Sequence, residues 1–490
     1  MMTDKTLSTA PNRPQTRIGS RTKLSSLKRD TEQSAPIILL VLLHAGLGLV
    51  LRESVLLSTL HALIVLALGI WKALTSKDLV GVLPFVAYVV GSEVLWRMTQ
   101  ANIFWEFSKY AVVLILVIAL LKQRKIKGGF LPLLFFVLLL PSIILTVNSF
   151  GFSETTREAI SFNLSGALTL CVCAIAFSNV RLTFSDTQKM IWWTVFPIVA
   201  IFSIALVTTL RSEEIIFTPD SNYVTSGGYG PNQVSAILGL GALLIGMLML
   251  ISRRKGFSFT PFILAVALLA QSLLTFSRGG VVNVAISVLA VITQLLLKPE
   301  RSAKRVFLFL TIILIITFIV APRLDRFTSG ALRERYSDFD TTGRTELIEA
   351  DLELFKNNQL AGVGVGMSSY LRRFMPGTAA HTEYSRLLAE HGIFGLVAIL
   401  LLVFMFIRAW FKAPNTISKA MVLALSAWAF VEMSHAAMRV AIIGFAFGWA
   451  LTDWELTSTI NEGETEQPKS HARLNRSLRS RNFLRPYRNN

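Results

Sequence analysis

Cysteine is almost absent from this chain, which has two, Cys171 and Cys173, in 490 residues. They stand one residue apart inside an apolar run, a spacing that suits neither a disulfide framework nor a metal site. We therefore expect both thiols to pack inside a helix.

Neither an internal repeat nor a secretory signal peptide is evident in the sequence. The two halves of the chain show no convincing self-similarity, which argues against a transporter, because many transporter folds consist of inverted repeats. The first apolar run begins only after about 35 polar residues, which is not the arrangement of a signal peptide.

Charged residues make up only 16% of the chain, whereas 53% of its residues are hydrophobic and its mean hydropathy is +0.56. One soluble core cannot bury so large an apolar fraction. About fourteen apolar runs can span or nearly span a bilayer. These are 36–51, 54–73, 79–96, 104–121, 130–147, 160–177, 190–210, 232–251, 257–276, 281–297, 306–320, 392–411, 420–434 and 440–451. Since several are short, we predict an all-α polytopic membrane protein with about 12–14 transmembrane helices.

Lysine is confined almost wholly to one set of connections. The basic tail 1–35 belongs in the cytoplasm by the positive-inside rule. Threading the chain alternately from there brings the lysine-rich connections and the basic tail 453–490 to the same side. These connections carry Lys72, Lys77, Lys122, Lys125, Lys127, Lys189, Lys255, Lys298, Lys304, Lys412 and Lys419. We expect both tails to be disordered and attracted to anionic membrane lipids.

Arginine dominates the opposite, outer side. Its connections carry Arg52, Arg97, Arg157, Arg211, Arg278, Arg323, Arg326, Arg333, Arg335, Arg344, Arg372, Arg373, Arg386 and Arg439. A guanidinium group is a planar, bidentate donor for phosphate or carboxylate, so these arginines predict an anionic ligand. The largest outer segment is a polar island, 322–391, between the spans of 36–321 and those of 392–452.

The first part of this island is charged. Arg333 and Arg335 are expected to be solvated, and residues 344–358 have a helical pattern that Thr341 or Thr342 can cap. An Asp-x-Asp triplet at 338–340 lies in the charged stretch, and we expect no metal site there.

The second part of the island contains a glycine run and a histidine. The run 362–366 follows a helix rather than a strand, so we interpret it as a flexible turn and not as a nucleotide-binding loop. His381, Tyr384 and His391 can share one face of a helix that enters the membrane. His381 is a candidate catalytic or ligand-binding group, although a histidine at the membrane interface more often forms hydrogen bonds without a functional role.

The segment that follows resembles the O-antigen ligase and polymerase family of bacterial polysaccharide assembly. That family's long periplasmic loop ends in the motif His-(Asn/Ser/Gln)-x9-Gly-x-x-(Gly/Thr/Tyr). Here the motif reads His381-Thr382, nine residues, Gly392-Ile393-Phe394-Gly395. Further similar stretches are 91–98, 157–163, 227–233, 277–280 and 342–345. Together they extend the resemblance over roughly 36–454, with both tails outside it.

The resemblance implies a GT-C-like fold and an inverting, metal-independent glycosyltransferase without a cofactor. Its donor would be a glycan on undecaprenyl diphosphate, and its acceptor either lipid A-core or another lipid-linked glycan. The enzyme would lie in the bacterial inner membrane with both termini cytoplasmic and its active site periplasmic. Other proteins of polysaccharide assembly are expected as partners, and nucleic acid is not.

Five arginines are candidates for binding the diphosphate, because fixed cations stabilise charge on a leaving phosphate. They are Arg278, Arg211, Arg97, Arg157 and Arg344. His381 would take or orient the proton of the acceptor hydroxyl, and Glu383 or Glu390 could orient the imidazole or replace it as base.

Two other functional classes stay open. A flippase for lipid-linked oligosaccharides could have a similar number of spans, but it would need its charges in a central cavity. A non-catalytic scaffold of an envelope complex would use the island as a docking surface.

Overall fold

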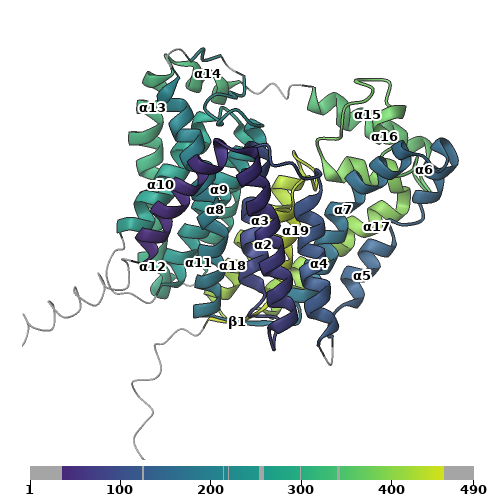
Figure 1. The fold of residues 1–490 in the computed structure, drawn as a ribbon, viewed down its shortest axis with the longest axis horizontal. Helices are drawn as coiled ribbons and strands as arrows, with labels where there is room; N and C mark the ends of the chain where they lie inside the picture. Colours follow the sequence, from purple (N-terminus) through teal and green to yellow (C-terminus); the bar gives the residue numbers. More distant parts are fainter. Residues whose placement is uncertain are drawn as a thin grey trace, which may run out of the picture.

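The computed structural model describes residues 36–123, 126–212, 215–218, 220–252, 259–297, 299–338 and 343–456. The predicted disordered tail 1–35, residues 457–490 of the other tail, the basic residues 253–255, Lys298 and the predicted caps Thr341 and Thr342 lie outside these ranges. Residues 453–455, predicted as part of the disordered C-terminal tail, instead form a strand. The described chain is almost entirely helical, with two short strands (Figure 1).

The helices follow one another closely along the chain. They are Pro36–Arg52, α2 (Val55–Thr75), α3 (Leu83–Met98), α4 (Phe107–Leu121), α5 (Phe130–Val137), α6 (Ile143–Phe150), α7 (Glu154–Phe177), α8 (Phe184–Arg211), α9 (Pro231–Ile251), α10 (Phe259–Leu274), α11 (Arg278–Leu296), α12 (Pro299–Ile315), the π-helical turn η1 (Ile316–Val320), α13 (Ala321–Phe327), α14 (Ala331–Ser337), α15 (Arg344–Asn357), α16 (Ser368–Leu371), α17 (Glu383–Lys412), α18 (Thr416–Met433) and α19 (Ala441–Ala450). The strands β1 (Arg181–Thr183) and β2 (Asp453–Glu455) pair in parallel.

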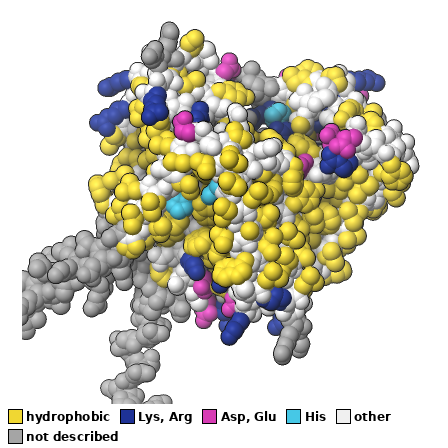
Figure 2. Space-filling view, viewed as in Figure 1, with side chains coloured by type: hydrophobic (Ala, Val, Ile, Leu, Met, Phe, Trp, Pro, Cys, Tyr) yellow, Lys and Arg dark blue, Asp and Glu magenta, His cyan; other side chains and the backbone are white. Residues whose placement is uncertain are grey.

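Eight helices among the described residues are long and apolar enough to cross a membrane, and four shorter apolar helices accompany them. Their outward side chains are apolar: Leu56 is 67% exposed and Phe307 71%. Figure 2 shows this surface as an apolar band, with the charged side chains gathered mainly toward its two ends. Such a surface is stable in lipid and not in water, so the predicted all-α polytopic membrane fold is confirmed.

Small residues allow the central helices to pack closely. A Cβ atom at Gly280 would overlap the backbone of Ser235, so α11 and α9 approach each other at this point. The Ser235 hydroxyl donates to the carbonyl of Ser277 at 3.0 Å. Gly166 of α7 meets the backbone of Met438 in the same way. Within lipid, where apolar burial does not drive association, close packing and hydrogen bonds hold helices together.

Two of the predicted spans have a different local structure. The apolar run 130–147 forms two short helices, α5 and α6, because Pro141 separates them. At the beginning of the polar island, the helix continues through η1 into α13 as far as Phe327. Pro322, which lacks an N–H donor, follows directly after the π-helical turn, where the α-helical hydrogen-bond pattern is already interrupted.

The bundle has two distinct ends (Figure 1). We call the end with α14, α15 and α16 the loop end, and the opposite end with β1 and β2 the strand end. At the strand end Lys412 forms an ion pair with Asp453. Lys122 donates to the carbonyls of Ala73 and Ser76 at the end of α2, at 3.1 and 2.8 Å. Lysines of the predicted cytoplasmic connections therefore gather at the strand end.

Candidate functional site

The histidine motif builds the start of α17 at the loop end. Thr382 is the N-cap of this helix, and its hydroxyl accepts a hydrogen bond from the Tyr384 amide at 3.2 Å. Any short polar side chain can satisfy an orphan amide in this position, which explains why threonine can stand there. His381 is therefore the residue immediately before the N-cap.

The glycine of the motif breaks the same helix. Gly392 has φ 59° and ψ −134°, a conformation that only glycine adopts without strain. The break lets the segment 359–364 dock on α17: Ile393 donates to the Gln359 carbonyl at 2.7 Å, and Val363 donates to the Ala389 carbonyl at 2.9 Å.

The glycine run 362–366 is packed, so its interpretation as a flexible turn is wrong. Gly362, Gly364 and Gly366 all have positive φ, and a Cβ atom on any of them would overlap a neighbouring helix. The physical reason is close approach: Gly362, Gly364 and Gly366 lie so near α17, α6 and α7 that a Cβ atom does not fit at any of them.

We predict that Gly392→Ala destabilises the protein by about 1–3 kcal/mol through backbone strain, with a further cost from overlap with the Gln359 carbonyl. Thermal unfolding of the purified protein should show a lower melting temperature. Gly377→Ala is the matched control, because Gly377 has φ 81° but open space around it, and the change should cost less. Equal stability of Gly392→Ala and wild type would contradict this role.

Buried ion pairs brace the helix that follows His381. Arg386 binds Glu383 on one side and Glu390 on the other, the latter at 2.7 Å. Glu383 also accepts a hydrogen bond from the Met438 amide at 3.1 Å. The contacts of Glu383 in this structure thus go to Arg386 and the 438 turn, which favours a positioning role over the role of a base.

A second buried pair connects this helix to the polar island. Arg372 donates to Asp351 of α15 at 2.7 Å, and Ser385 of α17 donates to the other oxygen of Asp351 at 2.8 Å. Because both partners are almost fully buried, breaking the pair would leave an uncompensated charge. The second half of the island is therefore a rigid part of the bundle.

Arg344 lies within electrostatic range of three other arginines, and both Arg344 and Arg439 lie within range of His381. We call the four the arginine cluster: Arg278, Arg335, Arg344 and Arg439. Arg278 donates to the Asp338 carbonyl, and the buried Arg335 donates to the Phe276 carbonyl at 2.9 Å. The expectation that Arg335 is solvated is wrong, because α14 packs onto the α10–α11 connection and takes this side chain with it.

The other two members of the cluster are Arg344 and Arg439. Arg439 donates through Nη2 to the Ala380 carbonyl at 2.6 Å, whereas its buried Nε has no hydrogen-bond partner among the described residues. Ion pairs within the described ranges include neither Arg344 nor Arg439. Burial and nearby arginines lower the pKa of the Arg344 guanidinium. An anion would relieve this repulsion and satisfy the free donor.

His381 is half-buried next to the cluster. Burial, together with the charges of Arg439, Arg344 and Arg372, lowers its pKa to about 4. The imidazole is therefore neutral near pH 7 and able to accept a proton. The structure brings three predicted site residues, His381, Arg344 and Arg278, into one region.

Arg97 is near this region but is already paired. It forms a buried ion pair with Glu93 at 2.5 Å, donates to Gln233 at 2.9 Å, and lies 4.0 Å from the centre of the Trp105 ring. The other oxygen of Glu93 accepts from the Ala441 amide at 2.6 Å. Arg97 and Glu93 therefore hold the turn that carries Arg439, which makes Arg97 a positioning residue.

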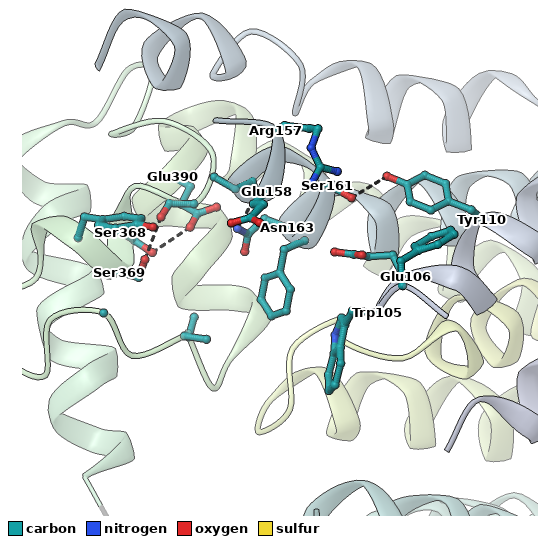
Figure 3. Close-up of a pocket in the computed structure, with 18 residues that line it drawn as sticks. Trp105, Glu106, Tyr110, Arg157, Glu158, Ser161, Asn163, Ser368, Ser369 and Glu390 are labelled. Carbon is teal, nitrogen blue, oxygen red and sulfur yellow. Dashed lines mark hydrogen bonds between the residues drawn. The ribbon is translucent and has the colours of Figure 1, made fainter. Parts of the chain in front are cut away.

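Two predicted phosphate ligands lie outside the arginine cluster. Arg157 is exposed, pairs with Glu154, and lines a different cavity (Figure 3). Arg211 is the last residue of α8, and its side chain is exposed. Glu390, the alternative orienting carboxylate, is buried between Arg386 and Ser368.

Sequence reasoning missed three residues of the site. Arg439 counted only as one of many outer arginines, and neither His435 nor Glu432 attracted notice. Asn283 of α11 donates to Glu432, and His435 Nε2 lies 2.8 Å from Asn283 Oδ1. Burial and the charge of Arg344 lower the pKa of His435 to about 4. The sequence feature that could have identified these three residues is the polar segment 432–439 between two short apolar runs.

The described residues contain no group of three or more His, Cys, Asp or Glu side chains placed to hold a metal ion.

Residues 263–400 match the family model described as O-antigen ligase, a segment that includes Arg278, Arg335, Arg344 and His381. Arg439 lies beyond it. No curated protein matches this chain. The matched segment supplies most of the site, so this part of the chain is similar to the O-antigen ligase family.

Proposed function

We propose that this protein transfers a glycan from undecaprenyl diphosphate to an acceptor hydroxyl, with inversion at the anomeric carbon and without a metal. The observation that supports it best is the buried, unpartnered Nε of Arg439 beside a neutral His381. A site with unsatisfied cationic donors and a neutral base fits a substrate that becomes more anionic as it reacts.

The proposed reaction needs a base on the acceptor side of the anomeric carbon and cations on the diphosphate side. His381 takes the proton of the acceptor hydroxyl while its oxygen forms a bond to the anomeric carbon. The bond from that carbon to the diphosphate oxygen breaks, and the diphosphate leaves with the electron pair. Attack opposite the leaving group inverts the configuration.

The arginine cluster stabilises the departing diphosphate. Arg344 and Arg439 form no ion pair within the described ranges, so they can bind phosphate oxygens bidentately. We propose Arg278 as a further ligand, whereas Arg97, Glu383 and Arg386 position the others. Arg211 and Arg157 lie outside the cluster, at the periphery of the outer surface. A bound diphosphate would also raise the pKa of His381 and make it a better base.

The pH profile of kcat/KM should reflect the lowered pKa of His381. Protonation removes the base, and the arginines oppose protonation, so activity should stay level down to about pH 5 and decline only toward pH 4. In Arg344→Gln the decline should move upward toward the ordinary histidine pKa of about 6.5. The exposed Arg333→Gln is the control and should leave the profile unchanged. A wild-type decline centred at pH 6.5 would contradict the assignment.

The proposed function also implies how the protein is oriented in its membrane and which membrane this is. If the strand end with its lysines faces the cytoplasm, the loop end and the site face the periplasm of a bacterial inner membrane. The acceptor would then be lipid A-core for a ligase, or another lipid-linked glycan for a polymerase.

Deletion in the native host tests the function and separates these two acceptors. Lipopolysaccharide gels should show core without long glycan and accumulated lipid-linked polymer if the protein is a ligase. A single repeat on core would indicate a polymerase. Unchanged lipopolysaccharide and exopolysaccharide would contradict the proposal, and accumulation of lipid-linked repeats on the cytoplasmic leaflet would favour a flippase.

A further inference from the structure

The cavity beside His381 differs in chemistry from the arginine cluster. It has a volume of about 810 Å³ and lies between α4, α7 and the segment 366–380. Its lining includes Ala380, the residue before His381, whose carbonyl accepts the hydrogen bond from Arg439. The cavity therefore begins next to the proposed base.

Aromatic rings form one side of this cavity. Trp105 is 42% exposed and Tyr110 36% exposed, and Phe162 lies on the facing helix α7. The Tyr110 hydroxyl and the Ser161 hydroxyl are 3.0 Å apart, which connects the two sides (Figure 3). Ring faces bury the apolar C–H faces of a pyranose while leaving its hydroxyl groups free to bond elsewhere.

Polar side chains form the rest of the lining. Glu106, Glu158 and Asn163 line the cavity together with Ser368 (Figure 3). Glu106 stands at the N-cap position of α4, yet its side chain does not cap the helix. Carboxylate and amide oxygens accept hydrogen bonds from the hydroxyl groups of a sugar.

Charge separates this cavity from the diphosphate site. Its one lining arginine, Arg157, is paired with Glu154, and Glu390 is paired with Arg386. Among the lining residues, the carboxylates Glu106, Glu158 and Glu390 outnumber the one arginine, which disfavours phosphate and anionic lipid headgroups and favours a neutral or amino sugar. A cavity of this size can hold a short oligosaccharide, since ligand pockets measure about 300–1,000 Å³.

We propose that this cavity binds the sugar residues of the acceptor glycan and presents its reacting hydroxyl to His381. The assignment as acceptor subsite rests on the proposed transferase function, whereas binding of a glycan by the cavity does not.

The test is direct binding, without turnover, of two lipid-free probes to the full-length protein in nanodiscs. The probes are the core oligosaccharide and the oligosaccharide repeat, both released by mild acid from the host's envelope. We expect one of them to bind wild type, and both Tyr110→Ala and Glu106→Gln to weaken it about tenfold, the loss of one ring contact or one charged hydrogen bond. Tyr110→Phe keeps the ring and should bind nearly as wild type does.

Matched controls lie outside the cavity. Phe152→Ala removes a 98% exposed ring beside α7, and Glu349→Gln an exposed carboxylate of α15, and neither should change binding. In a transfer assay the cavity variants should raise the acceptor KM and leave the donor KM unchanged. His381→Ala should retain glycan binding, so failure of catalysis and failure of this subsite can be told apart.

Two outcomes would overturn the proposal. One is that wild type binds neither probe, or that Tyr110→Ala and Glu106→Gln bind as wild type does. The other is that native mass spectrometry finds phospholipid, retained in a Tyr110-dependent manner, in place of glycan.

Discussion

Replacement of His381 by glutamine should lower kcat by about 10²- to 10⁴-fold, the usual contribution of a general base. Glutamine keeps hydrogen-bonding capacity at the start of α17 but cannot take a proton at neutral pH. The KM values for donor and acceptor should change little, because the arginine cluster and the neighbouring cavity still bind their substrates. Initial rates with purified protein and a lipid-diphosphate glycan measure the effect.

His61→Gln is the matched control for this variant. His61 is also partly buried and accepts a hydrogen bond from Trp96 at 2.8 Å, but it lies on α2, away from the arginine cluster. It should retain most of the transfer rate. Wild-type turnover by the His381 variant would remove this residue from the mechanism.

Replacement of Arg439 by glutamine should lower kcat by about 10²- to 10³-fold, the effect of removing a preorganised donor from a developing oxyanion. This corresponds to about 3–4 kcal/mol of transition-state stabilisation. Arg439→Lys should recover part of the activity, because lysine restores the charge but not the bidentate geometry. Arg344→Gln should behave like Arg439→Gln.

Arg333→Gln again supplies the control, because Arg333 is exposed on α14, two residues from the buried Arg335. Its removal should leave kcat within about twofold, as expected for a solvated surface charge. A loss as large as that of Arg439→Gln would mean that outer arginines act through general surface charge and not through a defined site.

The membrane fold could be predicted because apolar runs must be as long as the bilayer is thick. The predicted run 232–251 became α9, Pro231–Ile251, almost without change. The break at Pro141 also had a local signal, since proline removes a donor and interrupts a helix. The continuation of the helix past Pro322 had no local sequence signal, because a proline can equally begin a new helical segment.

The site was only partly visible in the sequence. The sequence motif identified both His381 and Gly392. The positive φ of Gly392 could not be predicted, because it results from the docking of 359–364 on α17. Arg439 had no local signal, because its importance comes from contact with Ala380, fifty-nine positions away in sequence. Arg335 looked like any charged loop residue until packing of α14 buried it.

The most direct measurement is a reconstituted transfer reaction with purified protein, a synthetic undecaprenyl-diphosphate glycan and an acceptor, carried out with a metal chelator present. We expect one undecaprenyl diphosphate released for each glycan transferred, and a product with inverted anomeric configuration. No transfer by the wild-type protein, retention of configuration, or complete inhibition by the chelator would contradict catalysis by His381 and the arginine cluster.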